Sequence, residues 1–178
     1  LHDIPNTVAR ASVGAGRLGV HMITLHTLGS KTMMKQAHET VLEYANRESW
    51  DPPKMLGVTI LTSMDQTALT SIGIDYPLEQ EVLTLAKSAQ EAGLDGIVCS
   101  PLELSFLKQH KKPNFVFVTP GIRNTGSDKN DQARTMTAGE ALTQGADYLV
   151  IGRPIIAAPD PAQAAQNLTQ EINSQQNN

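Results

Sequence analysis

Five short apolar runs, separated by segments with helical patterning, constrain the fold more than any other feature of this sequence. Each run is rich in β-branched residues and nearly continuous in apolar character, as expected of parallel strands that are buried on both faces. The runs are VHMITL (20–25), MLGVTIL (55–61), GIVC (96–99), FVFV (115–118) and YLVI (148–151). Strands that alternate with helices predict βαβ units and a parallel sheet, and hence an α/β fold.

Apolar residues at helical spacing occupy the segments between the strands and predict amphipathic helices. One stripe comprises Met34, Ala37, Val41, Tyr44 and Ala45, and another comprises Val82, Leu85, Ala86 and Ala89. Two helix starts carry a capping box, in which a hydroxyl residue is followed three positions later by a glutamate. These pairs are Ser100 with Glu103 and Thr137 with Glu140.

Two architectures fit this alternation. An open doubly wound sheet can stop after five strands, whereas a (β/α)8 barrel needs three more strands upstream, at roughly 30 residues per unit. Polar, glycine-containing segments follow nearly every strand, and those after the last two strands most resemble phosphate-binding loops. Barrels commonly bind phosphate at that place, which favours the barrel.

Composition limits the classes of function. The 178 residues, 40% of them hydrophobic, suffice for one single-core domain spanning residues 1–178. The net charge of −4 and the 4% aromatic content argue against nucleic acid as a partner, and the apolar runs are too short to span a membrane. Acidic and histidine residues do not cluster at ligand spacing, so we expect no metal. The single cysteine, Cys99, fits a reducing cytoplasm.

The loop after the fourth strand is TPGIRNTGSDKNDQ (119–132). Gly121 allows the backbone to approach a ligand closely. The polar run that follows lacks an apolar anchor and reads as a lid, with Arg123 and Gln132 as donors to an anion. The alternative is an ordinary solvated loop whose Arg123 pairs with a surface acid.

After the fifth strand, Gly152 and Arg153 precede a proline at a helix start. This order directs backbone N–H groups and a guanidinium towards one point, as in a phosphate cradle. A strand-end glycine beside a solvated arginine is the alternative. The two loops follow consecutive strands, and together they predict a phosphomonoester site.

Thr62 and Ser63 follow the second strand and predict either hydrogen bonds to a polar heterocycle or a cap on the next helix, the cap being the commoner role. His26 ends the first strand, where a hydrogen-bonded structural histidine is more common than a catalytic one. Walker, Gly-x-Ser-x-Gly and HxxxH motifs are absent from the sequence.

With these segments in place, the sequence resembles the orotidine 5′-phosphate decarboxylase family, in its bacterial form. The resemblance covers essentially the whole chain and rests on segments in the family's order and spacing. These segments include HDIPNT (2–7), VTILTSM (58–64), GLDGIVCS (93–100), VTPGIR (118–123) and YLVIGRPI (148–155). It implies a TIM barrel, of which the chain supplies the end of strand 3 and the last five βα units.

The family's catalytic signature, Asp-x-Lys-x-x-Asp-Ile-Pro-x-Thr, places Asp3, Ile4 and Thr7 in its second half. The resemblance implies that the lysine immediately precedes Leu1 and that roughly 60–70 residues of the barrel lie upstream. It implies a carbon–carbon lyase that converts orotidine 5′-monophosphate to uridine 5′-monophosphate in de novo pyrimidine biosynthesis, without a cofactor.

The resemblance also implies a homodimer in which Asp3, Ile4 and Thr7 act in the neighbouring subunit's site. Thr62 and Ser63 would meet the pyrimidine, and Pro120 would line the pocket. The phosphate would be held by Arg123, Gln132, Gly152 and Arg153, under a lid formed by residues 124–134.

Two other readings stay open at this point. The chain as given lacks the catalytic lysine, so it could be a non-catalytic nucleotide-binding fragment. It could also belong to a related barrel, a decarboxylase or aldolase that acts on a sugar phosphate with Mg²⁺. Such relatives need an additional acidic metal ligand and do not need Thr62, Ser63 or the long lid.

Overall fold

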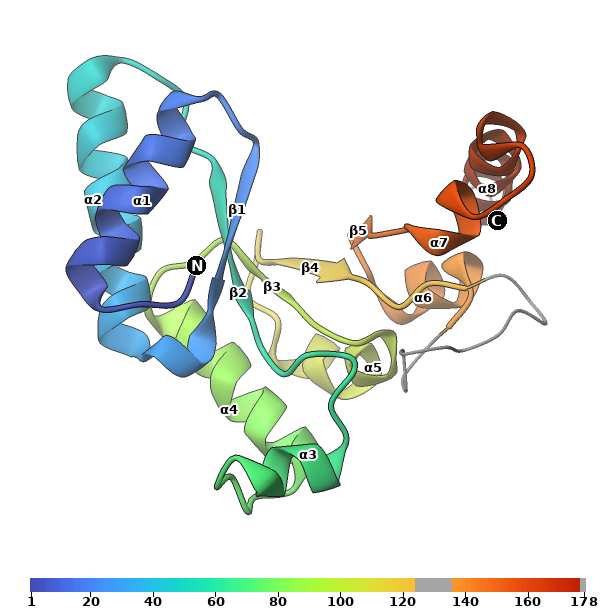
Figure 1. The fold of residues 1–178 in the computed structure, drawn as a ribbon, viewed down its shortest axis with the longest axis horizontal. Helices are drawn as coiled ribbons and strands as arrows, with labels where there is room; N and C mark the ends of the chain where they lie inside the picture. Colours follow the sequence, from blue (N-terminus) through green and yellow to red (C-terminus); the bar gives the residue numbers. More distant parts are fainter. Residues whose placement is uncertain (124–135, 177–178) are drawn as a thin grey trace. The chain divides into compact units, whose positions relative to one another are not determined.

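The computed structural model describes residues 1–123 and 136–176 (Figure 1). Within these ranges, five strands form one sheet in which they follow the order of the sequence. The strands are β1 (Met22–His26), β2 (Lys54–Val58), β3 (Gly96–Val98), β4 (Val116–Thr119) and β5 (Tyr148–Leu149). The pairs β1–β2, β2–β3 and β4–β5 are parallel. The predicted parallel α/β sheet is confirmed, although β2 and β5 end before their apolar runs do.

The chain divides into two compact units. Unit 1 comprises Leu1–Thr59, Glu79–Val98 and His110–Val116, and unit 2 comprises Ile60–Leu78, Cys99–Gln109 and Phe117–Asn178. The prediction of a single domain is not tested by this division.

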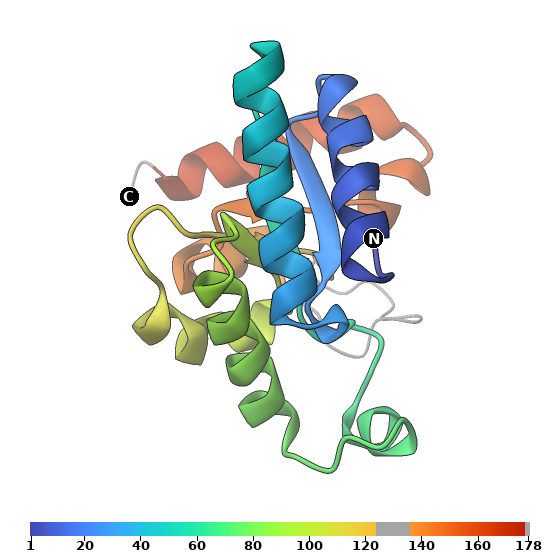
Figure 2. The ribbon, with the colours of Figure 1, turned by 90° about the vertical axis from the view of Figure 1, so that its left-hand side faces the viewer.

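Unit 1 contains the helices α1 (Pro5–Arg17), α2 (Lys31–Glu48) and most of α4 (Leu78–Glu91). Helices α1 and α2 run side by side next to β1 (Figure 2). The stripe predicted on α4 is buried in full. On α2 the buried residues are Met33, Met34, Ala37, Val41 and Ala45, so the stripe is confirmed except at Tyr44, which is only half-buried.

Unit 2 contains mostly short helices. They are α3 (Gln66–Ser71), α5 (Leu104–Leu107), α6 (Ala138–Gln144), α7 (Arg153–Ile156) and the longer α8 (Pro161–Gln176). Both predicted capping boxes are present. Glu103 and Ser100 are buried and begin a 3₁₀ turn (Pro101–Glu103) ahead of α5, whereas Thr137 and Glu140 begin α6.

An aspartate anchors the start of a strand at two equivalent places, Asp95 before β3 and Asp147 before β5. The Asp95 carboxylate accepts a hydrogen bond from the Met55 N–H (2.8 Å), and the Asp147 carboxylate accepts one from the Phe117 N–H (2.6 Å). Each aspartate also donates its own N–H to the carbonyl of the same partner residue. These paired bonds fix the register between β2 and β3 and between β4 and β5, and they give the Met55 and Phe117 N–H groups a partner where each ladder begins.

Gly96 in β3 provides a direct test of the packing in unit 1. A Cβ at this position would lie 2.4 Å from the Val116 carbonyl oxygen and 2.9 Å from a Leu56 methyl carbon. We therefore expect Gly96→Ala to lower the free energy of unfolding by about 1–3 kcal/mol or more, since overpacking a core forces the backbone to move.

The matched control is Gly14→Ala, in the exposed middle of α1, where an added Cβ meets no atom within 4 Å. It should raise stability by up to about 1 kcal/mol, because alanine is the better helix former. Urea unfolding of the intact protein measures both variants. Equal effects of the two substitutions would contradict the packing described for β3.

Among the described residues, none of the helices is both long enough and apolar enough to cross a membrane.

Candidate active site

The N-terminal segment continues the sheet of unit 1 beyond β1. The Leu1 backbone nitrogen donates to the Thr24 carbonyl (2.8 Å), and the His26 N–H donates to the Leu1 carbonyl (2.9 Å). In a parallel strand pair, a residue donates to one residue of the neighbouring strand and accepts from the residue two positions further on, as Leu1 does with Thr24 and His26. Leu1 therefore has the geometry expected from the interpretation of LHDIPNT as a strand end.

Asp3, Ile4 and Thr7 follow on an exposed stretch. The Asp3 carboxylate accepts a hydrogen bond from the Ile4 N–H (2.6 Å). Ile4 is the N-cap residue of α1, and Pro5 occupies the first helical position, where its missing N–H costs nothing. Ile4 exposes 66% of its surface although it is a large apolar residue. The three predicted site residues of unit 1 thus lie together at the start of α1.

In unit 2, Thr62 is buried and Ser63 is exposed, in the segment between β2 and α3. The N-cap of α3 is Asp65, whose carboxylate accepts from the Ala68 N–H (2.8 Å). The capping role that the sequence favoured for Thr62 and Ser63 is therefore wrong, because the carboxylate two residues further on takes it.

The loop after β4 is held at its base by a short parallel bridge. Ile122, which is fully buried, pairs with Met136, and the Arg123 N–H donates to the Met136 carbonyl (3.0 Å). Gly121 has a positive φ of 80°, which permits the turn after Pro120. The half-buried Arg123 side chain donates from Nη1 to the Ile122 carbonyl (2.6 Å).

Gln132 and the predicted lid, residues 124–134, fall in the segment 124–135, so this predicted donor and the lid lie outside the described residues.

After β5, Gly152 is the N-cap of α7 and its carbonyl accepts from the N–H groups of Ile155 (2.9 Å) and Ile156 (3.0 Å). Arg153 and Pro154 occupy the first helical turn. A Cβ added at Gly152 would meet no atom within 4 Å, so the space beside this backbone is open.

The two arginine-bearing loops leave the same edge of the sheet. Strands β4 and β5 are parallel neighbours with Val118 opposite Tyr148 and Thr119 opposite Leu149, and the Val150 N–H extends the ladder to the Thr119 carbonyl (2.9 Å). Because parallel strands end at one edge, the segments 120–123 and 151–153 begin next to each other. Unit 2 therefore brings together the two loops that the sequence predicted to bind phosphate.

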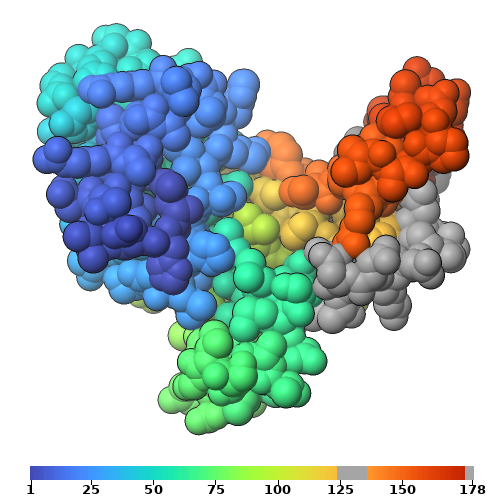
Figure 3. All heavy atoms as spheres, in the orientation of Figure 1, coloured from blue at the N-terminus to red at the C-terminus, as the bar shows by residue number. Residues whose placement is uncertain are grey.

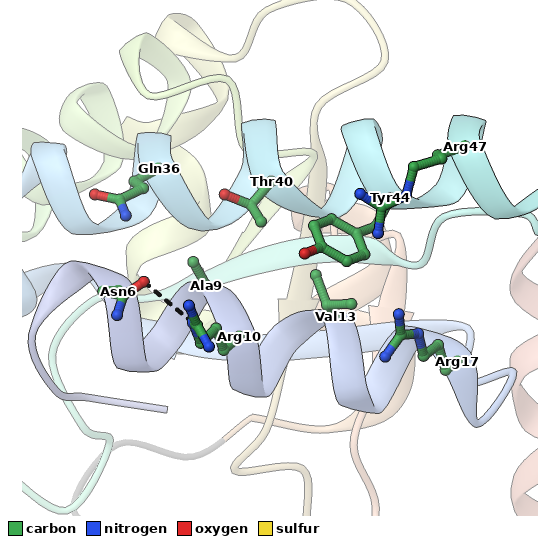
Figure 4. Close-up of a pocket in the computed structure, with 9 residues that line it drawn as sticks. All are labelled: Asn6, Ala9, Arg10, Val13, Arg17, Gln36, Thr40, Tyr44 and Arg47. Carbon is green, nitrogen blue, oxygen red and sulfur yellow. Dashed lines mark hydrogen bonds between the residues drawn. The ribbon is translucent and has the colours of Figure 1, made fainter.

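A groove of about 470 Å³ lies between α1 and α2 (Figure 4). It is lined by Asn6, Ala9, Arg10, Val13, Arg17, Gln36, Thr40, Tyr44 and Arg47. None of the predicted site residues lines it. Tyr44, expected in the core, instead faces this groove.

Each arginine that lines the groove already interacts with a neighbouring side chain. Arg10 donates to Asn6 (3.4 Å), and Arg17 binds both oxygens of Glu48 (2.5 and 2.8 Å). Arg47 lies over the Tyr44 ring at 3.9 Å. Hydrogen bonds from Arg17 lower the pKa of Glu48 to about 2. We therefore do not assign the groove to the substrate.

In the part of the chain that the structure describes, no group of three or more His, Cys, Asp or Glu residues is placed to hold a metal ion.

Comparison with known proteins identifies the family. The model of the orotidine 5′-phosphate decarboxylase / HUMPS family matches residues 1–168. The chain belongs to this family. A protein of Trichlorobacter lovleyi named orotidine 5′-phosphate decarboxylase is 50% identical over 172 residues, covering 96% of this chain and 70% of that protein. The protein of the same name from Moorella thermoacetica is 49% identical, with 96% and 68% covered.

Solved structures agree with this membership. The crystal structure of orotidine 5′-phosphate decarboxylase from Lactobacillus acidophilus has a TM-score of 0.82 and 36% identity, over 97% of this chain and 72% of that one. The Pyrococcus horikoshii OT3 enzyme of that name, at 23% identity and a TM-score of 0.72, supports the fold alone. These neighbours are TIM barrels, so the five parallel strands are part of such a barrel and the open doubly wound sheet is excluded.

Proposed function

We propose that the protein decarboxylates orotidine 5′-monophosphate to uridine 5′-monophosphate in cytoplasmic pyrimidine biosynthesis, as a homodimer and without a cofactor. The observation that carries this proposal is the common edge shared by the loops after β4 and β5, in a chain about 50% identical to proteins named for this reaction. The common edge supports a phosphate site, and the identity supports the pyrimidine nucleotide as its ligand.

The phosphate would be bound by Arg123, Gly152 and Arg153, with Gln132 as a further donor. Two guanidinium groups and backbone N–H groups suit a dianion, because charge-assisted hydrogen bonds are the stronger kind. Each such bond contributes about 1.5–3 kcal/mol, which in sum holds a phosphomonoester firmly. The open space beside Gly152 is the feature that such a ligand requires.

The pyrimidine would lie against Thr62, Ser63 and Pro120. Since Asp65 caps α3, helix capping does not account for the two hydroxyl residues after β2. A hydroxyl can both donate to and accept from the amide edge of a pyrimidine ring, which makes the pair suited to this base.

Chemistry would centre on Asp3 and on the lysine that the family signature puts immediately before Leu1. Cleavage of the carbon–carbon bond releases CO₂ and leaves its electron pair on C6 of the ring. The lysine ammonium stabilises this developing charge and then donates its proton to C6. Asp3 holds the ammonium in place. The first aspartate of the family signature, which would lie upstream of Leu1, would stand against the substrate carboxylate and favour its release as CO₂.

The homodimer is proposed because Asp3, Ile4 and Thr7 are exposed at the start of α1 rather than packed within their own unit. The N-terminal segment and α1 lie at the surface of that unit (Figure 3). An exposed apolar residue beside a carboxylate and a hydroxyl suits a surface that completes a neighbour's site. Thr7 would reach the ribose hydroxyls of the nucleotide bound there.

The test is turnover by the intact protein, followed as the loss of ultraviolet absorbance when orotidine 5′-monophosphate is converted. We expect turnover that persists in the presence of EDTA. A sugar phosphate with Mg²⁺ is assayed in parallel, because a related barrel that acts on such a substrate is the alternative enzyme reading. Turnover of the sugar phosphate alone would overturn the proposal, and binding of uridine 5′-monophosphate without any turnover would favour the non-catalytic reading.

A further inference from the structure

We infer that His2 and His26 form a stacked pair that positions Asp3 for catalysis. This inference rests on the proposed function, because it assigns the pair a role through Asp3. Neither histidine is among the residues predicted to touch the substrate, and both lie in unit 1 with Asp3.

The pair joins the end of a strand to the segment that carries the carboxylate. The two imidazole rings are stacked, with centroids 5.5 Å apart and planes inclined by 18°. His26 is the last residue of β1 and the N-cap of the 3₁₀ turn Thr27–Gly29. His2 immediately precedes Asp3, so the stack ties the neighbour of the carboxylate to a rigid element.

Other contacts hold residue 2 in place on the same strand end. The Leu1 backbone is bonded to Thr24 and to His26. His2 also packs against the turn after β1, since its Cδ2 lies 3.1 Å from where a Cβ at Gly29 would be.

On the other side of Asp3, the chain is fixed by the start of α1. Ile4 is the N-cap, Pro5 has a restricted φ, and the Ile4 carbonyl accepts from the Val8 N–H (3.2 Å). Asp3 thus lies between two fixed points, the stack and the helix start. Its backbone position depends on both, although its side chain is exposed.

The surroundings of the stack favour the neutral form of His26. Burial lowers the pKa of His26, and the nearby His2 lowers it further. Among the charged residues that follow in sequence, Asp3 comes directly after His2, and Lys31 begins α2 and pairs with Glu91 at 2.6 Å. Because the folded state takes up this proton less readily than the unfolded chain, stability rises with pH across the shift and is lost as the pH falls below about 6.5.

The test compares His26→Ala, which removes the stack, with His26→Phe, which keeps an aromatic ring that cannot be protonated. In the intact protein, His26→Ala should lower kcat about tenfold with little change in KM. A displaced Asp3 slows the chemical step, whereas substrate binding depends on the phosphate-binding residues, which this substitution does not touch. His26→Phe should retain most of kcat and should lose part of the acid-side decline of the wild-type pH profile.

The control is His21→Ala, at the exposed opposite end of β1, which should match the wild type. His2→Phe and His2→Ala repeat the comparison from the other ring if a His26 variant does not fold. Amide exchange at Ile4, which does not depend on activity, should speed up in the alanine variants only.

A wild-type kcat in both alanine variants would overturn the inference while leaving the proposed function intact. So would a His26→Phe variant that is as impaired as His26→Ala. Absence of turnover in the wild type would instead refute the proposed function, and the exchange measurement would still show whether the stack fixes the segment around Asp3.

Discussion

Replacing Asp3 with asparagine lowers kcat for orotidine 5′-monophosphate about a hundredfold to a thousandfold, the usual effect of removing one preorganised electrostatic group from an active site. Asparagine keeps the shape of the side chain and an oxygen that can accept from the Ile4 N–H, so the local turn survives. The lost negative charge no longer holds the lysine ammonium beside C6. Steady-state kinetics with the intact protein measures the change.

Asp51→Asn is the matched control, since Asp51 is also exposed and lies in unit 1. It should leave kcat unchanged. The melting temperature of the Asp3 variant should equal that of the wild type, because the carboxylate is exposed. A wild-type kcat in the Asp3→Asn variant would remove this residue from the mechanism.

Replacing Arg153 or Arg123 with alanine weakens binding of uridine 5′-monophosphate by roughly tenfold to a hundredfold each, as the loss of one charge-assisted hydrogen bond predicts. The lost affinity comes from contacts to the phosphate. Both variants should therefore bind uridine, which lacks that group, as well as the wild type does. Isothermal titration with the nucleotide and the nucleoside separates the phosphate contribution from that of the base.

Arg47→Ala serves as the control for loss of an arginine, because Arg47 lies on α2 over the Tyr44 ring. Its affinity for the nucleotide should be that of the wild type. If the Arg123 or Arg153 variant lost affinity for uridine to the same extent as for the nucleotide, that arginine would not be a phosphate ligand.

The sheet was predictable because its signal is local. Buried parallel strands read as continuous apolar runs, and the runs at 20–25 and 96–99 became β1 and β3 nearly as expected. Glycine and arginine directly after two consecutive strands were enough to place both loops at one edge. The capping boxes at Ser100 and Thr137 were equally local and are present.

The features that sequence reasoning missed depend on contacts between distant residues. Thr62 and Ser63 precede α3 and were predicted to cap it, but only the backbone path decides that Asp65 accepts the Ala68 N–H instead. Tyr44 has helical spacing with the core stripe, but two arginines that stack on its ring draw it to the groove. The stack of His2 on His26 requires the register of Leu1 against β1, which no pattern along the chain reveals.

The central claim is that Asp3 of one subunit acts in the phosphate-holding site of the other, and subunit mixing tests it most directly. Homodimers of Asp3→Asn and of Arg123→Ala/Arg153→Ala, each nearly inactive, are dissociated together and reassembled. Half of the randomly formed dimers are hybrids with one intact site, so about a quarter of wild-type activity should return. If the mixture stays as inactive as its parents although hybrid dimers have formed, Asp3 does not serve its neighbour's site.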